Sequence, residues 1–180
     1  MTEMALRPWR EEDICALPAL AGDWEVAKNL RDVFPHPYGE KDAVNYICSV
    51  QAATPQEALM YAIAVDGRLA GSIGIFREKD VYQKSAELGY WLGRAYWGHG
   101  IMPEAVQALL RYGFGELKLE AVWCSHYDWN RQSRRVIEKC GFRYQFTKKT
   151  TNVMNATHET VFYALKREEW DSLHGKKEFV

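Results

Sequence analysis

The sequence lacks both a long apolar run and an excess of charge of either sign. No stretch approaches the roughly 18 consecutive apolar residues of a membrane-spanning helix, and the N-terminus lacks the apolar segment of a secretory signal. The formal net charge is -1, so the composition gives no support to a nucleic-acid partner or an acidic membrane. We therefore expect a cytoplasmic protein with no membrane and no nucleic-acid partner.

Cysteine is also scarce and scattered. The four cysteines form no C-x-x-C pair and have no histidine at the spacing of metal ligands; they are Cys15, Cys48, Cys124 and Cys140. A structural zinc site and a disulfide framework are therefore not expected. We predict that the protein holds no metal and keeps its thiols reduced.

What the sequence does contain is typical of one globular domain. Its 180 residues are 47% hydrophobic and 26% charged, enough to bury a core without disulfides or metals. It has no internal repeat, low-complexity tract or linker-like run, so we predict a single domain over residues 1–180. Seven Trp and ten Tyr hint at a lined groove, although large aromatic residues more often fill cores.

The first half of the chain predicts helices followed by an antiparallel meander. We expect strands at 4–9, 61–65, 68–76 and 86–92, and helices at 13–28 and 41–53. The clearest local signal is Asp66-Gly67, a dipeptide that two-residue hairpin turns favour. Proline on both sides of His36 favours an extended or turn conformation in the loop between the two helices.

The second half predicts two β-α units and a closing pair of strands. Apolar residues recur at helical spacing from 106 to 117, at Val106, Leu109, Leu110, Gly113 and Leu117. A strand at 121–126 precedes a helix that Asn130 caps and Gly141 ends. Strands at 142–148 and 158–165 follow. The predicted class is therefore α+β, with a mostly antiparallel sheet.

The segment Trp97-Gly-His-Gly100 lies between a predicted strand and a helix that opens near Pro103. Glycines let the backbone approach a phosphate closely, and the first N–H groups of a helix have no internal acceptors. An ordinary glycine turn is the alternative reading of this segment. A dinucleotide fingerprint is absent because the third glycine is missing, and no Gly-Lys-Ser/Thr follows, which excludes a Walker loop.

Two motifs in order resemble those of the GCN5-related N-acetyltransferase (GNAT) superfamily. Glu87-Leu-Gly-Tyr-Trp-Leu92, Tyr96-Trp-Gly-His-Gly100 and Pro103-Glu-Ala-Val106 resemble its pyrophosphate motif. Asn130-Arg-Gln-Ser133 and Val136-Ile-Glu-Lys-Cys-Gly-Phe142 resemble the second CoA motif of its ribosomal-protein-acetyltransferase-like branch. One position departs from the family pattern: Ala95 stands where the loop usually begins with Gln or Arg.

The resemblance implies a fold and a cofactor site. It implies a central sheet flanked by helices on both faces and split into a V-shaped slot for acetyl-CoA. The pantetheine arm would pair with the strand end, and the pyrophosphate would lie on the backbone of the glycine loop. The implied cofactor-binding residues are Trp91, Leu92, Gly93, Arg94, Ala95, Trp97, Gly98, His99, Gly100, Ile101, Met102, Asn130 and Ser133.

Acyl transfer to an amine needs a base, and two residues are our catalytic candidates. At pH 7 on the order of a tenth of an α-amine is neutral, and far less of a lysine amine, so a base helps both. Glu87 is the first candidate because its strand is expected to line the slot; its alternative reading is a half-exposed surface residue. Ser133 resembles a position that the branch uses near the departing thiolate, although it could simply bond the Asn130 cap.

The leading hypothesis is an N-acetyltransferase that uses acetyl-CoA as co-substrate. The acceptor would be a primary amine, either a protein N-terminus or a small amine, attacking directly in a ternary complex. One alternative is a CoA-binding sensor or scaffold without turnover, which the replaced residue Ala95 favours. Another is an unrelated α+β domain that binds no CoA. Members of the family are often dimers, but no feature of the sequence decides between a monomer and a homodimer.

Overall fold

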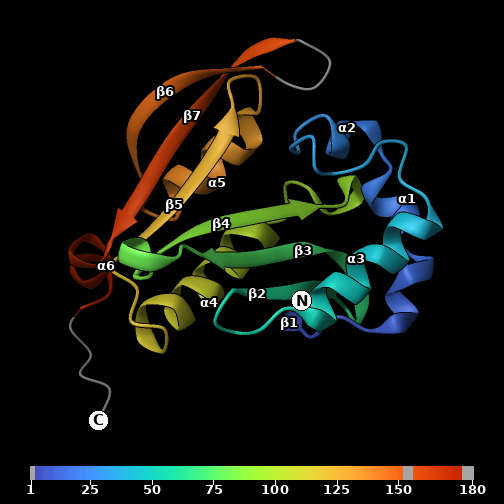
Figure 1. Cartoon of the computed structure of the whole chain (residues 1–180), viewed down its shortest axis with the longest axis horizontal. Helices are drawn as coiled ribbons and strands as arrows, with labels where there is room; N and C mark the ends of the chain where they lie inside the picture. The colour runs from blue at the N-terminus through green and yellow to red at the C-terminus, as the bar shows by residue number, and fades with distance from the viewer. Residues whose placement is uncertain (1–2, 152–155, 176–180) are drawn as a thin grey trace. The chain divides into compact units, whose positions relative to one another are not determined.

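The computed structural model describes residues 3–151 and 156–175. Seven strands of this described part form one sheet, in the order β1-β2-β3-β4-β5-β7-β6 (Figure 1). The predicted α+β class with a mostly antiparallel sheet is confirmed. The chain groups into two compact units, one made of Met1–Gly74 and Gly89–Ala105, the other of Ile75–Leu88 and Val106–Val180.

The first unit begins with short elements, continues into the meander and ends at the start of α4. Its elements are β1 (Met4–Arg7), a 3-10 turn (Glu11–Cys15), α1 (Leu17–Ala21), α2 (Trp24–Ala27), α3 (Glu40–Ala52), β2 (Ala58–Val65), most of β3 (Arg68–Arg77), the second half of β4 (Ser85–Leu92), a 3-10 turn (Arg94–Tyr96) and the first residues of α4 (Ile101–Gly115). β1 pairs antiparallel with β2, from Met4 opposite Val65 to Arg7 opposite Ala62. The hairpin predicted at Asp66-Gly67 is confirmed, since both residues have positive φ, 48° and 77°, as a type I′ turn requires.

The single helix predicted over 13–28 is wrong, because three short helical pieces replace it. After α1, Gly22 lies so close to the preceding turn that an added Cβ would stand 2.5 Å from the Pro18 carbonyl oxygen. Asp23 then starts a new helix, its side chain accepting the N–H of Glu25 at 2.8 Å. The apolar pattern continues across this break, which is why it resembled one helix.

These short pieces enclose a core that also includes the strands of the same unit. The cluster contains Leu17, Ala21, Ile47, Leu69 and Trp91, all buried. Beside it, the carboxylate of Asp13 accepts two hydrogen bonds from the Arg7 guanidinium, at 2.6 and 2.8 Å. The Asp13 side chain is only 4% exposed, so the pair is largely shielded from water.

The second unit contains the later β-α units. Its elements are the end of β3, the first half of β4 (Ser85–Leu92), most of α4 (Ile101–Gly115), β5 (Ala121–Tyr127), α5 (Arg131–Lys139), β6 (Arg143–Thr151), β7 (Thr157–Lys166) and α6 (Arg167–His174). β5 and β6 both pair antiparallel with β7. β4 pairs parallel with β5 over three residue pairs, ending at Glu87 opposite Trp123. The V-shaped slot that the family resemblance implies stays a prediction.

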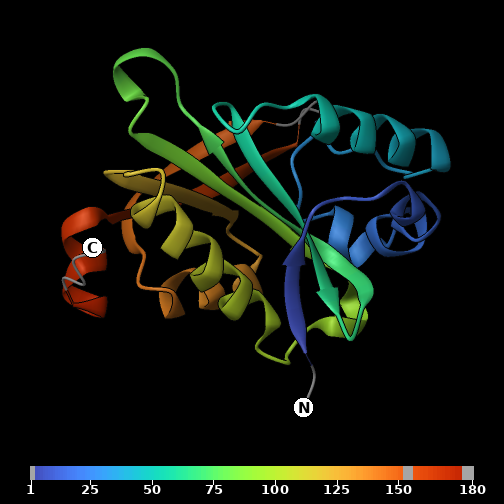
Figure 2. The same cartoon turned by 90° about the horizontal axis from the view of Figure 1, so that it is seen from below.

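The helices of this unit cover one face of its strands. Val122, Cys124 and His126 point to the buried face of β5, while Trp123, Ser125 and Tyr127 point to the other, partly exposed face. On the buried face, α4 and α5 lie side by side (Figure 2), and the Gln107 side chain donates to the Cys140 carbonyl at 3.4 Å. No helix among the described residues is long and apolar enough to cross a membrane.

The helix α6 was missed from the sequence. Its segment is mostly polar, so the apolar periodicity that marks α4 is absent. Tertiary contacts fix it instead: the Trp170 ring stacks on Phe114 at 5.2 Å, and the Arg167 side chain donates to the Phe114 carbonyl at 3.1 Å.

Candidate functional site

The segment between β4 and α4 folds into a short, internally bonded loop in the first unit. The N–H of Tyr96 donates to the Gly93 carbonyl at 2.9 Å, which forms a 3-10 turn over Arg94–Tyr96. The indole N–H of Trp97 reaches back and donates to the Leu92 carbonyl at 2.7 Å. These two hydrogen bonds therefore fix the backbone conformation of the loop just before its glycines.

The two glycines of this loop adopt backbone conformations that disfavour other residues. Gly98 and Gly100 have φ of 79° and 78°, and a Cβ added at either would meet nothing within 4 Å. Open space therefore lies in front of both residues. The helix α4 begins directly afterwards, with the N–H of Glu104 donating to the Gly100 carbonyl at 3.3 Å.

This geometry fits the pyrophosphate of a CoA molecule. The side chains of Ile101 and Met102 are buried, at 5% and 6% exposure, and anchor the first turn of α4. The first N–H groups of a helix lack intrahelical acceptors and lie at its positive end, which favours an anion. Ala95 is an exposed residue of the 3-10 turn, so its side chain is not required for backbone binding.

Three predicted pantetheine contacts lie just before this loop. Trp91 and Leu92 are each 8% exposed, and the Gly93 N–H donates to the Ala70 carbonyl at 2.8 Å. An added Cβ at Gly93 would stand 2.7 Å from Leu20 Cδ2, so α1 packs directly against this point. The Leu92 carbonyl and the Gly93 N–H thus already have partners, and strand-like pairing with pantetheine at 91–93 stays a prediction.

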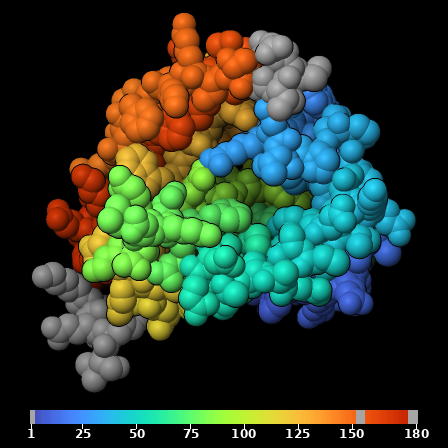
Figure 3. All heavy atoms as spheres, in the orientation of Figure 1, coloured from blue at the N-terminus to red at the C-terminus, as the bar shows by residue number. Residues whose placement is uncertain are grey.

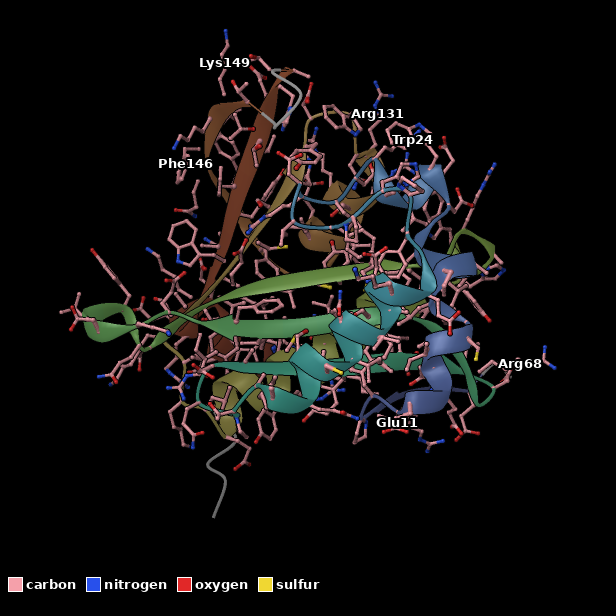
Figure 4. All side chains as sticks on the ribbon, turned by 45° about the vertical axis from the view of Figure 1, so that its right-hand side comes forward. Glu11, Trp24, Arg68, Arg131, Phe146 and Lys149 are labelled. Atoms are coloured by element: carbon pink, nitrogen blue, oxygen red, sulfur yellow. The ribbon has the colours of Figure 1, made fainter. Side chains whose placement is uncertain are left out.

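Several aromatic residues of the N-terminal region contact one another in the same unit. The Phe34 ring stacks on Tyr38 at 5.1 Å and meets Trp91 edge-on at 6.2 Å. Trp24, on α2 in Figure 4, lies 5.0 Å from the His36 ring. Burial, together with the nearby Tyr46 and Asp42, raises the pKa of Tyr38 to about 12, so its hydroxyl is protonated at neutral pH.

The second unit places Glu87 on an open face of its sheet. Glu87 is partly exposed, whereas its neighbours Ala86 and Leu88 are buried. It lies directly opposite Trp123 in the parallel pairing of β4 and β5, and partners in register share a face. Glu87 therefore lies beside an indole on a partly exposed face, and its role as the general base stays a prediction.

Asn130 and Ser133 form the predicted cap of α5. The Asn130 side-chain oxygen accepts the Ser133 N–H at 3.0 Å. This bond joins the amide oxygen of Asn130 to the backbone N–H of Ser133, which is the cap that the sequence predicts. The catalytic role of Ser133 and the cofactor-binding roles of both residues stay predictions.

The pair Cys124 and His126 does not look like a nucleophile and its base. Both side chains are buried, at 3% and 7% exposure, and both point to the helix-covered face of β5. His126 Nδ1 lies 2.7 Å from the Tyr127 carbonyl oxygen, which fixes the proton on that nitrogen. No group of three or more metal-ligating side chains occurs within residues 3–151 and 156–175.

Sequence reasoning missed a row of rings beside Glu87. The Phe146 ring stacks on Phe162 at 4.7 Å and lies 6.4 Å from Trp123. The alternation along β5 already indicated that Trp123 and Tyr127 share a face. The partners from β6 and β7 could not be found that way, because they depend on strand register.

Comparison with known proteins identifies the family. A model of the acetyltransferase (GNAT) domain matches residues 3–143. A putative ribosomal N-acetyltransferase of Bacillus subtilis, YdaF, is 35% identical over 107 residues, which are 59% of this chain and 58% of that protein. The match thus spans less than two thirds of the relative's length.

Solved structures share the fold. A GNAT-family acetyltransferase from Bacillus anthracis has a TM-score of 0.80 at 26% identity, covering 93% of this chain and 98% of the other. Mycobacterium smegmatis RimJ, solved in complex with CoA-disulfide, has a TM-score of 0.83 at 22% identity, covering 92% and 83%. With its domain match, its two motifs and its glycine loop, this chain belongs to the acetyltransferase (GNAT) family.

Proposed function

We propose that the protein transfers an acetyl group from acetyl-CoA to a primary amine by direct attack in a ternary complex. The observation that carries this proposal is the loop in which Gly98 and Gly100, with positive φ and open space before them, lead into α4. A protein N-terminus is one candidate acceptor, as the name of the Bacillus subtilis relative suggests, and a small amine is the other. A cytoplasmic location belongs to the same proposal.

In the proposed reaction, the neutral amine attacks the thioester carbonyl, the new C–N bond forms and the C–S bond breaks. Glu87 accepts the proton that the amine loses, directly or through a water molecule. The Ser133 hydroxyl donates a hydrogen bond to the departing thiolate, which takes up a proton from solvent. A base is needed because about nine tenths of an α-amine is protonated at pH 7.

A binding protein without turnover is the second candidate, and Ala95 is the residue that favours it. The two functions are separated by calorimetric titration with acetyl-CoA followed by a thiol-release assay with a panel of amines and peptides. Micromolar binding with thiol release supports the enzyme, whereas binding without release for every acceptor favours the sensor. Absence of binding contradicts both.

The role of Glu87 is tested by Glu87→Gln, with Glu116→Gln, an exposed carboxylate just after α4, as the matched control. Removing a general base lowers kcat by about 10²- to 10⁴-fold, while the dissociation constant of acetyl-CoA stays within about twofold because the cofactor loop is unchanged. The pH profile of kcat should lose its acidic limb in Glu87→Gln alone. An unchanged profile would remove Glu87 from the mechanism.

A further inference from the structure

Two glycines lie opposite each other in the neighbouring strands β3 and β4. In the first unit, the Gly93 N–H donates to the Ala70 carbonyl at 2.8 Å, which fixes the register at the end of β4. Counting four residues inward along both antiparallel strands places Gly74 opposite Gly89. We call these two residues the glycine pair. No side chain of its own covers the backbone of either strand at this point.

The register is the same at the hairpin end of the two strands. There the Glu78 N–H donates to the Ser85 carbonyl at 3.0 Å, eight positions from the first bond on each strand. No residue is therefore inserted near the glycine pair. Glycine in the interior of a strand weakens it relative to alanine, and it often occurs where a ligand approaches the backbone closely. Gly89 is partly exposed, so a ligand can reach this point from solvent.

Ser72 lies beside the glycine pair on the same face. It is two positions before Gly74 on β3 and opposite Trp91, and residues related in these ways share a face of the sheet. Its side chain is buried, at 6% exposure, and its hydroxyl oxygen lies 2.9 Å from the hydroxyl oxygen of Tyr46 on α3. The helix α3 lies in front of β3 in Figure 1 and forms part of the surface, in cyan and teal, in Figure 3.

The two hydroxyl groups carry two protons, and only one of these lies in the bond between them. The phenol is the stronger acid, so we assign its proton to that bond, with Tyr46 donating to Ser72. Burial raises the pKa of Tyr46, although the bond to Ser72 lowers it in part, and the phenol stays protonated at neutral pH. Within the described part of the chain, neither hydroxyl makes a further side-chain hydrogen bond. The buried Ser72 proton is costly in that state, and an oxygen atom of a bound ligand would satisfy it.

The glycine pair lies where the proposed reaction would take place. Along β4, Gly89 comes between Trp91, which is proposed to contact the pantetheine arm, and the proposed base Glu87. A nitrogen atom above Gly89 is one diagonal step from Ser72, and such neighbours are about 7–8 Å apart. The serine side chain and one hydrogen bond of about 2.8 Å span most of this distance. The remainder corresponds to a link of two carbon atoms.

We propose that Gly89 and Ser72 form the subsite for the group beside the reacting amine, and that this group carries an oxygen atom two carbons from the nitrogen. The amine-bearing carbon lies against the bare backbone of Gly89, and the Ser72 hydroxyl donates to the oxygen. A hydroxyl oxygen of an amino alcohol and a carbonyl oxygen of an amino amide supply the same lone pair. This inference rests on the proposed acetyl transfer and adds two specificity-determining residues to it.

Ser72→Ala and Tyr46→Phe are a matched pair of variants. Each removes one hydroxyl group and breaks the same hydrogen bond, so both should lower the melting temperature by a similar amount. Only Ser72→Ala removes the proton that is proposed to bind the acceptor. A difference between the two variants in acceptor preference therefore reports recognition, whereas a shared loss reports structure.

The assay measures kcat/KM at saturating acetyl-CoA for 2-aminoethanol, glycinamide and propylamine, expressed per neutral amine. The first acceptor carries a hydroxyl oxygen, the second a carbonyl oxygen and the third none. Ser72→Ala should lower kcat/KM for the oxygen-bearing acceptors by about 2- to 12-fold, the value of one neutral hydrogen bond, mainly through KM. Its value for propylamine should stay within about twofold. Tyr46→Phe should leave the preference for oxygen unchanged. A loss confined to one oxygen-bearing acceptor also supports the subsite and identifies the oxygen as hydroxyl or carbonyl.

Gly89→Ala tests the other half of the subsite. The added methyl group occupies the place of the amine-bearing carbon, so kcat/KM should fall by about 10- to 200-fold for all three acceptors. Acetyl-CoA affinity should stay within about twofold. The melting temperature should stay the same or rise, because alanine suits a strand interior better than glycine. A lower melting temperature with unchanged kcat/KM in the folded variant would show that Gly89 has only a packing role.

Failure of the inference and failure of the proposed function look different. If Ser72→Ala and Tyr46→Phe change the preference equally, or if Ser72→Ala slows propylamine as much as 2-aminoethanol, the inference is overturned. If the parent protein acetylates no amine, the proposed activity fails, and NMR titration in the presence of acetyl-CoA tests the subsite directly. Shifts of the Gly89 amide signal with 2-aminoethanol that Ser72→Ala abolishes would support it. No shift, or an equal shift with propylamine, would overturn it.

Discussion

Replacing the loop glycines with alanine separates their structural role from their role in binding. Gly98, Gly100 and the hairpin residue Gly67 all have φ between 77° and 79°, and none has an atom within 4 Å of an added Cβ. All three also belong to the first unit. Gly67→Ala is therefore a matched control, with the same backbone strain outside the proposed cofactor site.

The expected loss of stability is the same at all three positions. A residue other than glycine in the left-handed region costs about 1–2 kcal/mol. For a chain of this size, 1 kcal/mol lowers the melting temperature by about 2–4 °C. Thermal melting of Gly67→Ala, Gly98→Ala and Gly100→Ala should therefore give similar shifts.

The expected loss of affinity differs. A methyl group at residue 98 or 100 occupies the open space that the phosphates are proposed to use and separates them from the backbone N–H groups. One hydrogen bond to a charged group contributes about 1.5–3 kcal/mol, and each 1.4 kcal/mol is about tenfold in the dissociation constant. Titration calorimetry should show acetyl-CoA binding about 10- to 100-fold weaker in Gly98→Ala and Gly100→Ala, and unchanged in Gly67→Ala.

The reasoning is refuted if the loop variants bind acetyl-CoA as tightly as Gly67→Ala does. In that case the positive φ angles would reflect only a tight turn. Gly98→Val extends the test, since a branched side chain has a larger strain and occupies more of the same space. A folded Gly98→Val that binds normally would remove the loop from the cofactor site.

Three further predictions test the fold. Asp13→Asn breaks the buried pair with Arg7 and should destabilise the protein by about 3 kcal/mol in denaturant unfolding, whereas Glu12→Gln, in an exposed pair, should cost about 0.5 kcal/mol or less. Burial raises the pKa of Asp13, but the hydrogen bonds from the Arg7 guanidinium and the Arg10 N–H outweigh it and hold that pKa below its ordinary value. The ionised pair therefore stabilises the parent protein above about pH 4, and this stabilisation is lost as the pH falls further. Asp13→Asn should lack this dependence on pH. Gly71→Ala places a Cβ 2.3 Å from a carbonyl oxygen of β4 and should cost about 3 kcal/mol or more, while Gly115→Ala, in open space at the end of α4, should be neutral or stabilise by up to about 1 kcal/mol, both measured by denaturant unfolding. A thiol reagent should modify two of the four cysteines quickly in the native protein and all four after unfolding; rapid native modification of a buried one would contradict the packing. The exposed cysteines are Cys15 and Cys48, and the buried ones are Cys124 and Cys140. Burial raises the pKa of the Cys140 thiol to about 11.

Local chemistry made part of the fold predictable. Asp66-Gly67 specifies its turn because both residues tolerate positive φ. Asn130 and Gly141 mark the ends of α5 by side-chain capping and by φ of 93°. Such signals depend on a few neighbouring residues, so they can be recognised in the sequence without knowledge of the tertiary structure.

Features that depend on packing, within a helix or between distant segments, could not be predicted from the apolar pattern. The break between α1 and α2 depends on how Gly22 packs against its own helix, and the apolar pattern runs through it unchanged. α6 is held by Trp170 and Arg167 against α4. The glycine turn before α4 could be predicted because it is contiguous in the chain. The rings of Trp123, Phe146 and Phe162 come from three strands, so their contacts depend on strand register.

The contact between Leu20 and Gly93 has a consequence for how such proteins diverge. A methyl group at residue 93 would stand 2.7 Å from Leu20 Cδ2 and 3.2 Å from the Ala70 carbonyl oxygen. The Ala70 carbonyl cannot move easily because it belongs to the backbone, but Leu20 can be exchanged for a smaller residue. Relatives with alanine or serine at the position of Gly93 are therefore expected to carry a compensating smaller residue at the position of Leu20. A chimaera that takes its N-terminal helices from one relative and its glycine loop from another would have to inherit both positions from the same parent.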